Sequence, residues 1–390
     1  MTDNRSQRIP YLDILRTVAL IAITSTHALN RSFAIFEGAR EEYLALPLIA
    51  SVCKALLYVF NRMGVPLFLM ISGALLLPRD YSGQYGRFLK KNWLRLFLTT
   101  EIWLALMFWY MQLFPGSFLE TEGLKECLLR FAMTLLFLNP LRMSSMWYME
   151  MILCLYLMIP IFSAALRSLS PRVFILPILL VILHRCLWPD VQNVLSGLEV
   201  DRDFTPALTA SNLFPVYAVF LLMGCFCAKG CFSRIPTPAV AAIFLGSFLG
   251  YAAMQFWMYS LPNNVVLGDV YRSLWLTVSV VSLFELIRRR KHVFPAEERV
   301  CRFLSEISFG VYFVHICIME GLNYLLDLHW AGLRHFGRYA LLELVSVAGS
   351  VLIIQLLRRI PGVGLYLFGV KPPKAPSAAT PPDGGEKLPV

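Results

Sequence analysis

Apolar runs of about 20 residues recur along the whole chain, and they limit its fold more than any other feature. A helix needs roughly 20 predominantly apolar residues to cross a bilayer. Hydrophobic residues make up 57% of the 390 positions and charged residues only 15%, whereas about a quarter of an ordinary soluble domain is charged. The sequence therefore predicts an all-α, polytopic membrane protein.

Ten membrane spans, with both chain ends in the cytoplasm, are predicted from hydropathy and charge. The spans cover residues 11–30, 62–78, 92–113, 146–166, 172–188, 213–228, 236–258, 267–287, 306–325 and 338–357. With the N-terminus inside, 22 of the 35 Lys and Arg residues fall in cytoplasmic segments and 12 in outer segments. Cytoplasmic loops are enriched in Lys and Arg, so this bias supports the orientation. The net charge of +10 then reports orientation and requires no nucleic-acid partner.

Two further apolar segments are predicted to lie outside the bilayer. Leu46–Phe60 contains Lys54, and Leu124–Leu138 contains two cationic residues and a glutamate. Both have the character of amphipathic helices that lie on the outer surface or of re-entrant pieces. If either one were a span, the charge bias of everything after it would be reversed.

The sequence predicts one membrane domain followed by a tail. The domain covers residues 1–360, and residues 361–390, rich in Pro, Gly and Ala, form a predicted disordered cytoplasmic tail. No cleavable signal peptide is predicted, because the first apolar segment has charges inside it and no small-residue cleavage pattern. Among nine scattered cysteines, Cys225, Cys227 and Cys231 form a cluster without a second paired motif or nearby histidines. No metal site is therefore predicted.

The first span, Tyr11–Asn30, carries the polar residues Asp13, Arg16 and His27. A charged side chain inside a membrane helix costs at least ~2.5 kcal/mol, and such residues usually face a pathway or a site. At about 100° and 1.5 Å per residue, Arg16 and His27 lie within about 20° of the same face and roughly 16 Å apart. One helix thus offers a guanidinium near one membrane surface and an imidazole more than halfway across. The alternative is a surface Asp–Arg pair and a histidine satisfied by a neighbouring helix.

Cationic residues gather where a cytoplasmic loop enters the third span. They are Arg87, Lys90, Lys91 and Arg95, of which the last two lie four residues apart on one helix face. They serve either as anchors of the positive-inside kind or as an anion site for a phosphorylated cytoplasmic ligand, because cationic side chains bind phosphate.

Other polar and aromatic residues have both a structural and a functional interpretation. Ser72 precedes Gly73, and small residues there are explained by close helix packing or by an exposed hydroxyl at an unwound turn. Trp147 fits an interfacial aromatic belt. Glu150 lies just inside the outer boundary, where it either pairs with Arg142 or contacts a polar substrate.

A second histidine, His315, lies about midway across the ninth predicted span. It follows Ser308 by seven residues, so both occupy a similar face. A buried neutral histidine bonded to a serine or a backbone carbonyl is a common structural arrangement, but with His27 at similar depth the pair favours a shared polar cavity. No GxSxG, Walker or HExxH pattern is present, so soluble hydrolase, NTPase and zincin chemistry are not supported.

Five motifs, in order, resemble the membrane acyltransferase-3 family over residues 9 to 360. The opening LDILRTVALIAITSTH carries that family's Arg-x10-His pattern at Arg16 and His27. The last motif, SEISFGVYFVH, has Ser308 and His315 in the family's Ser-Tyr/Phe-x-x-Tyr-x-x-His arrangement. The other three are PLFLMISGALL, MWYMEMILCLYLMIP and PVYAVFLLMGCFCA.

The resemblance implies an acyl-CoA-dependent O-acyltransferase, here an O-acetyltransferase of the short branch that acts on surface polysaccharides, in a bacterial inner membrane. Acyl-CoA is the expected co-substrate, with no other cofactor, and the expected acceptor is a hydroxyl of a cell-envelope glycan or glycolipid. His27 is assigned as the general base, since an imidazole pKa near ~6.5 suits that task, and Asp13 is expected to orient Arg16. The remaining assignments are acyl-CoA binding for Arg16, Lys90, Lys91 and Arg95, and cavity or acceptor contacts for Ser72, Trp147, Glu150, Ser308 and His315.

One departure from the family pattern concerns the acyl-CoA assignment. The family often has Arg-x-x-Arg where the third helix begins, and this chain has Asn92 in the first of those places and Arg95 in the second. The neighbouring lysines supply charge, but an ammonium cannot make the bidentate contact of a guanidinium.

Two other classes of function remain open at this point. A secondary transporter or flippase for a charged small molecule also places Arg, Asp and His inside the membrane, although no internal repeat supports it. The other class is a non-catalytic sensor or scaffold in envelope biogenesis. The sequence leaves open the acyl group, the acceptor, the membrane face of the chemistry, an acyl-enzyme versus direct transfer, and the oligomeric state.

Overall fold

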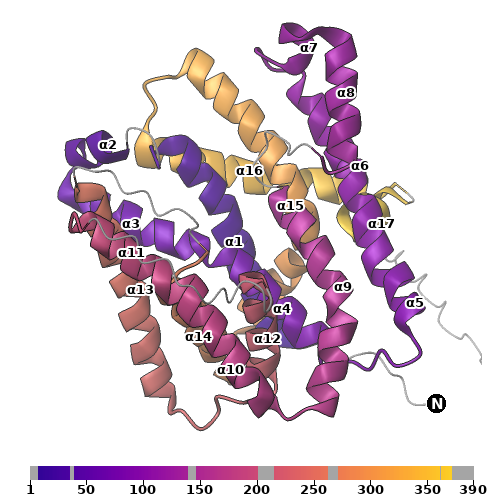
Figure 1. Cartoon of the computed structure of the whole chain (residues 1–390). Helices are drawn as coiled ribbons and strands as arrows, with labels where there is room; N and C mark the ends of the chain where they lie inside the picture. Colours follow the sequence, from indigo (N-terminus) through magenta and orange to yellow (C-terminus); the bar gives the residue numbers. More distant parts are fainter. Residues whose placement is uncertain are drawn as a thin grey trace, which may run out of the picture.

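The computed structural model describes residues 8–35, 39–138, 146–200, 215–261, 271–360 and 362–370. Throughout these residues the chain is helical and contains no strand (Figure 1), which confirms the predicted all-α fold for this part of the chain. The helices are α1 (Pro10–Ser32), α2 (Ala39–Ala45), α3 (Leu48–Arg62), α4 (Gly64–Leu76), α5 (Tyr85–Phe88), α6 (Leu94–Met111), α7 (Phe118–Thr121), α8 (Gly123–Leu135), α9 (Trp147–Ser168), α10 (Ile175–Ile182), α11 (Trp188–Gly197), α12 (Val216–Ala228), α13 (Thr237–Ser260), α14 (Leu274–Arg289), α15 (Pro295–His329), α16 (His335–Leu357) and α17 (Val363–Phe368).

Eight helical stretches within the described ranges are long and apolar enough to cross a membrane. They are Pro10–Ser32, Leu48–Leu76, Tyr85–Met111, Trp147–Ser168, Pro171–Gly197, Thr237–Ser260, Pro295–His329 and His335–Leu357. The predicted spans 213–228 and 267–287 correspond to α12 with 13 residues and α14 with 16 residues. The first residues of each of these two predicted spans lie outside the residues that the structure describes. The polytopic architecture is confirmed, with eight candidate spans where ten were predicted.

Helix α1 lies inside the bundle and carries the first part of the site (Figure 1). It packs against α15, α4, α16 and α3. Apolar residues such as Leu15 and Ala19 are buried on it, and so are the polar residues Asp13 and His27. Because protein covers nearly every face of this helix, its polar side chains meet other helices and not lipid.

Helices α4 and α12 approach each other closely through two glycines. A Cβ atom added to Gly73 would overlap the carbonyl oxygen of Leu221, and one added to Gly224 would overlap that of Met70. Small residues permit such close approach between membrane helices. Close helix packing, one of the two interpretations of the Ser72-Gly73 pair, therefore explains Gly73.

Helix α3 is not the surface helix that was one of the two alternatives predicted for residues 46–60, the other being a re-entrant piece. That prediction depended on Lys54, which is only 1% exposed because its Nζ donates to Glu42 Oε1 and to the Ala34 carbonyl, each at 2.8 Å. The helix packs against α13 and α1 and continues through Met63 into α4. Hydropathy could not show that a carboxylate of a different helix neutralises this lysine. The other excluded segment corresponds to α8, which is not among the eight candidate spans of the described residues.

A helix packs against the bundle beyond residue 360, the predicted boundary between domain and tail. Helix α17 follows it and packs against α6, α15 and α16. Phe368, for example, is 1% exposed, and Trp103 Nε1 of α6 donates to the Leu367 carbonyl at 2.9 Å. The membrane domain therefore extends through residue 370, and the rest of the predicted tail, 371–390, lies outside the described residues.

Candidate active site

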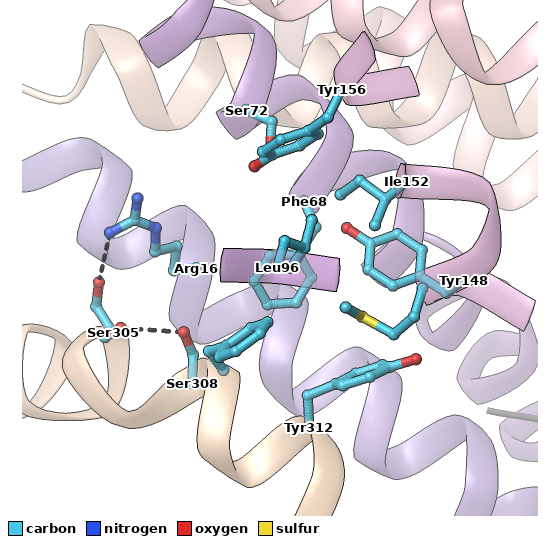
Figure 2. A pocket seen from close by; sticks show the side chains of 12 residues that line it. Arg16, Phe68, Ser72, Leu96, Tyr148, Ile152, Tyr156, Ser305, Ser308 and Tyr312 are labelled. Carbon is cyan, nitrogen blue, oxygen red and sulfur yellow. Dashed lines mark hydrogen bonds between the residues drawn. The ribbon is translucent and has the colours of Figure 1, made fainter. Parts of the chain in front are cut away.

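A cavity of about 260 Å³ lies beside Arg16, enclosed by α1, α4, α6, α9 and α15. Its wall combines apolar side chains with hydroxyl groups (Figure 2). The Tyr156 ring reaches across toward Ser72, and both line the cavity. The polar lining consists of Arg16, Ser72, Tyr148, Tyr156, Ser305, Ser308 and Tyr312. Three predicted site residues, Arg16, Ser72 and Ser308, are thus brought together.

Ser305 joins the guanidinium of Arg16 to the carboxylate of Asp13. Arg16 Nη1 donates to Ser305 Oγ at 3.4 Å, and Ser305 Oγ donates to Asp13 Oδ1 at 2.6 Å. Ser308 Oγ donates to the Ser305 carbonyl at 3.0 Å, one turn along α15 (Figure 2). The direct Asp13–Arg16 contact expected from the sequence is replaced by this hydroxyl link.

The carboxylate of Asp13 forms its ion pair with a different arginine, Arg8. Arg8 Nε lies 2.6 Å from Asp13 Oδ2, and Arg8 Nη1 lies 2.6 Å from Glu306 Oε1. The hydrogen bond to Asp13 raises the pKa of Arg8 above its ordinary value, so this side chain stays charged throughout the neutral range. The chain before α1 is thereby fastened to the beginning of α15.

A second, wider cavity of about 620 Å³ shares Arg16 and Ser305 with the first. Arg8 and Arg79 line it together with Arg16, opposite the carboxylates of Asp13 and Glu306. We call this cavity the mouth. Arg8 is paired with both carboxylates, so the guanidinium groups that suit a ligand carrying phosphates are those of Arg16 and Arg79.

The cationic residues predicted to bind acyl-CoA lie elsewhere. Lys90 and Lys91 are exposed on the π-helical turn Leu89–Trp93, and Arg95 is exposed on α6 with its Nη2 donating to the Leu365 carbonyl at 3.1 Å. None of the three lines either cavity beside Arg16. Arg8 and Arg79 occupy the mouth instead, and the sequence indicated them only as part of the cytoplasmic charge bias.

The two mid-membrane histidines form a pair between α1 and α15. The ring centroids of His27 and His315 are 5.4 Å apart, and both side chains are buried. His315 Nδ1 lies 2.7 Å from the Val311 carbonyl, which only accepts hydrogen bonds, so Nδ1 carries the proton and Nε2 keeps a lone pair. Among the described residues, neither His315 Nε2 nor His27 Nδ1 has a hydrogen-bond partner.

A short series of aromatic rings connects the first cavity to this histidine pair. Tyr148 and Tyr312 line the cavity with ring centroids 5.7 Å apart, and the Tyr312 ring lies 6.4 Å from that of His315. The histidines therefore sit one side chain behind the cavity wall. Tyr312 follows Ser308 by one helical turn and is the tyrosine of the Ser-Tyr/Phe-x-x-Tyr-x-x-His motif identified in the sequence, where it was given no role in the site.

Residues 9–357 match the acyltransferase domain model of the acyltransferase-3 family. The chain belongs to the acyltransferase-3 family. It is a multi-pass membrane acyltransferase, and the match covers the histidine pair and every residue of the two cavities except Arg8. A search of curated proteins and a search of solved structures found no match.

The predicted acceptor residues of this acyltransferase lie on α9. The Trp147 ring packs between those of Tyr271 and Tyr217, at centroid distances of 5.3 and 5.8 Å. Glu150 is partly buried one turn further along and lines neither cavity beside Arg16. Its predicted partner Arg142 lies outside the described residues. No group of three His, Cys, Asp or Glu side chains in the described ranges is arranged to hold a metal ion.

Proposed function

We propose that this membrane acyltransferase transfers an acetyl group from cytoplasmic acetyl-CoA to a hydroxyl of a cell-envelope glycan or glycolipid, in a bacterial inner membrane. The observation that carries the proposal is the position of Arg16. Its guanidinium lines both the cationic mouth and the inner cavity, and the inner cavity leads through Tyr312 to the histidine pair.

The donor side of the proposal rests on two arginines of the mouth, because Arg8 is held in its ion pairs with Asp13 and Glu306. Arg16 and Arg79 supply charge-assisted hydrogen bonds to the phosphates of CoA. The pantetheine arm then enters the inner cavity, whose apolar wall and tyrosine hydroxyls suit a chain of methylene and amide groups. The thioester at its end is thereby directed toward Tyr312 and the histidines behind it.

The chemical step uses His27 as the general base. A sugar hydroxyl is a weak nucleophile until a base takes its proton as it attacks the thioester carbonyl. His27 accepts that proton, the new C–O bond forms, the C–S bond breaks, and the CoA thiolate leaves and is protonated. His315 holds an unprotonated Nε2 beside His27, so it can accept a hydrogen bond from the imidazolium that forms.

Acyl transfer by purified protein tests the proposal. We would reconstitute the protein in nanodiscs with radiolabelled acetyl-CoA and a crude envelope glycan fraction, and compare wild type with His27→Ala and Arg16→Ala. Exposed residues provide the matched controls His329→Ala and Arg359→Ala. We expect acceptor-dependent transfer that is lost in the first two variants and kept in the controls. No transfer by wild type with any acceptor fraction would overturn the proposal, and movement of a solute without covalent transfer would favour a transporter.

A further inference from the structure

Arg62, the last residue of α3, is a buried cation to which the chemistry above assigns no role. Its side chain is 6% exposed, within a stretch long and apolar enough to span the membrane. The guanidinium Cζ lies 4.6 Å from the centre of the Tyr58 ring. Its Nε is buried without a hydrogen-bond partner among the described residues.

Two other buried cationic side chains show what this position lacks. Lys54 lies 2.8 Å from Glu42 Oε1, and Arg338 lies 2.5 Å from Asp327 Oδ1. Arg62 takes part in none of the ion pairs between described residues. A buried charge without a counter-charge is strongly unfavourable, and in a membrane segment it usually marks a functional site.

Hydrogen bonds between α1 and α3 place Arg62 next to His27. Thr26 Oγ1 donates to the Asn61 carbonyl at 3.1 Å, and Ser25 Oγ donates to Asn61 Oδ1 at 2.6 Å. His27 follows Thr26 directly and Arg62 follows Asn61 directly, so the two side chains begin from neighbouring backbone positions.

We propose that Arg62 stabilises the oxyanion of the acyl transfer. When the acceptor oxygen bonds to the thioester carbon beside His27, the electron pair of the C=O double bond moves onto the carbonyl oxygen, and the acceptor's proton passes to His27. The guanidinium then faces a negative charge, which no carboxylate in the described part of the chain supplies to it in an ion pair. As the intermediate collapses, the C=O double bond re-forms, the C–S bond breaks, and the CoA thiolate leaves and takes the proton from His27. The inference rests on the proposed function.

The contacts of Arg62 with Tyr58, a cation–π contact and a side-chain hydrogen bond, do not by themselves explain its burial. A cation–π contact offsets only part of the desolvation of a guanidinium, and an apolar side chain would fill the same place without that cost. A preorganised cation is of most use where negative charge develops in a water-poor site. The two explanations predict opposite relations between activity and stability.

The test compares Arg62→Met with Arg62→Lys and with Lys54→Met in nanodiscs. For Arg62→Met we expect kcat to fall by about 10²- to 10³-fold, as for loss of an oxyanion donor, with an unchanged KM for acetyl-CoA and a thermal midpoint equal to or above that of wild type. Arg62→Lys keeps a point charge and recovers part of kcat. Lys54→Met leaves the Glu42 carboxylate without its cation and lowers the midpoint.

Two results would overturn the inference. The first is an unchanged kcat in Arg62→Met, and the second is a loss of activity that only follows a lowered thermal midpoint. If wild type is active, His27→Ala is inactive and Arg62→Met resembles wild type, only the inference fails. If wild type transfers no acetyl group, the proposed function fails and the inference fails with it.

Discussion

The imidazole rings of His27 and His315 lie 5.4 Å apart, at the interface of two helices from opposite ends of the chain. The Val311 carbonyl holds the proton of His315 on Nδ1, which leaves its Nε2 as an acceptor inside the protein. A histidine with an adjacent acceptor is the arrangement by which a base is oriented and its cationic form is stabilised. His315 is therefore expected to act through His27.

Replacement of His315 by asparagine tests this relationship. The asparagine amide can still donate to the Val311 carbonyl, but it lacks the second ring nitrogen, so we expect kcat to fall by about 10²-fold, within the usual contribution of acid–base groups. The KM for acetyl-CoA should stay unchanged. The measurement is steady-state transfer with labelled acetyl-CoA across a range of pH, with His329→Ala as the control. An unchanged kcat and pH profile would show that His315 only fills space.

Replacement of Ser305 by alanine tests the link between Asp13 and Arg16. The hydroxyl donates to Asp13 and accepts from Arg16, so its loss should let the guanidinium move. A net loss of about 1 kcal/mol corresponds to an increase of about fivefold in the KM for acetyl-CoA. Ser350→Ala, which removes a buried hydroxyl bonded only to the Ser346 carbonyl, is the matched control. Equal KM values for the two variants would contradict the link.

Two sets of residues have now been assigned to acyl-CoA binding, the arginines of the mouth and the predicted lysines Lys90 and Lys91, and substitutions distinguish between them. Arg79 lines the mouth and Lys90 and Lys91 do not, so Arg79→Ala should raise the KM for acetyl-CoA by about tenfold through loss of a charge-assisted contact. The double variant Lys90→Ala/Lys91→Ala should change it by less than about twofold, as for exposed charges. Titration of acetyl-CoA at two salt concentrations measures both. A larger effect in the lysine variant would favour the assignment made from the sequence.

Sequence periodicity was sufficient for contacts within one helix. The Arg16–His27 spacing, and the shared face of Ser308 and His315, follow from 3.6 residues per turn. Periodicity does not predict which residues of different helices contact each other. Ser305 lies one turn before Ser308, but nothing in the sequence shows that its hydroxyl meets both Arg16 and Asp13 of α1. Hydropathy alone likewise gives a buried lysine and an exposed lysine the same value.

The α4–α12 contact gives a prediction for stability. A methyl group at Gly224 would overlap the Met70 carbonyl, and because backbone cannot move aside as a side chain can, Gly224→Ala should separate the two helices and lower the thermal midpoint. Gly246→Ala is the matched control, since a Cβ at Gly246 of α13 meets no atom within 4 Å and alanine is favoured in a helix by up to about 1 kcal/mol. Thermal unfolding in nanodiscs distinguishes them. Equal midpoints would mean that α4 and α12 are less closely packed than described.

Truncation distinguishes between residue 360 and residue 370 as the C-terminal boundary of the membrane domain. Helix α17 accepts three hydrogen bonds from α6 side chains through the carbonyls of residues 365–367, the shortest being 2.8 Å from Thr99 Oγ1. A chain that ends after residue 370 keeps these bonds and should unfold at the wild-type temperature. A chain that ends after residue 360 leaves Trp103 and Thr99 as buried donors without acceptors, at a cost of about 1–3 kcal/mol each, and also removes the buried Phe368 side chain. It should unfold at a lower temperature, whereas equal stability of the two truncations would restore the boundary at 360.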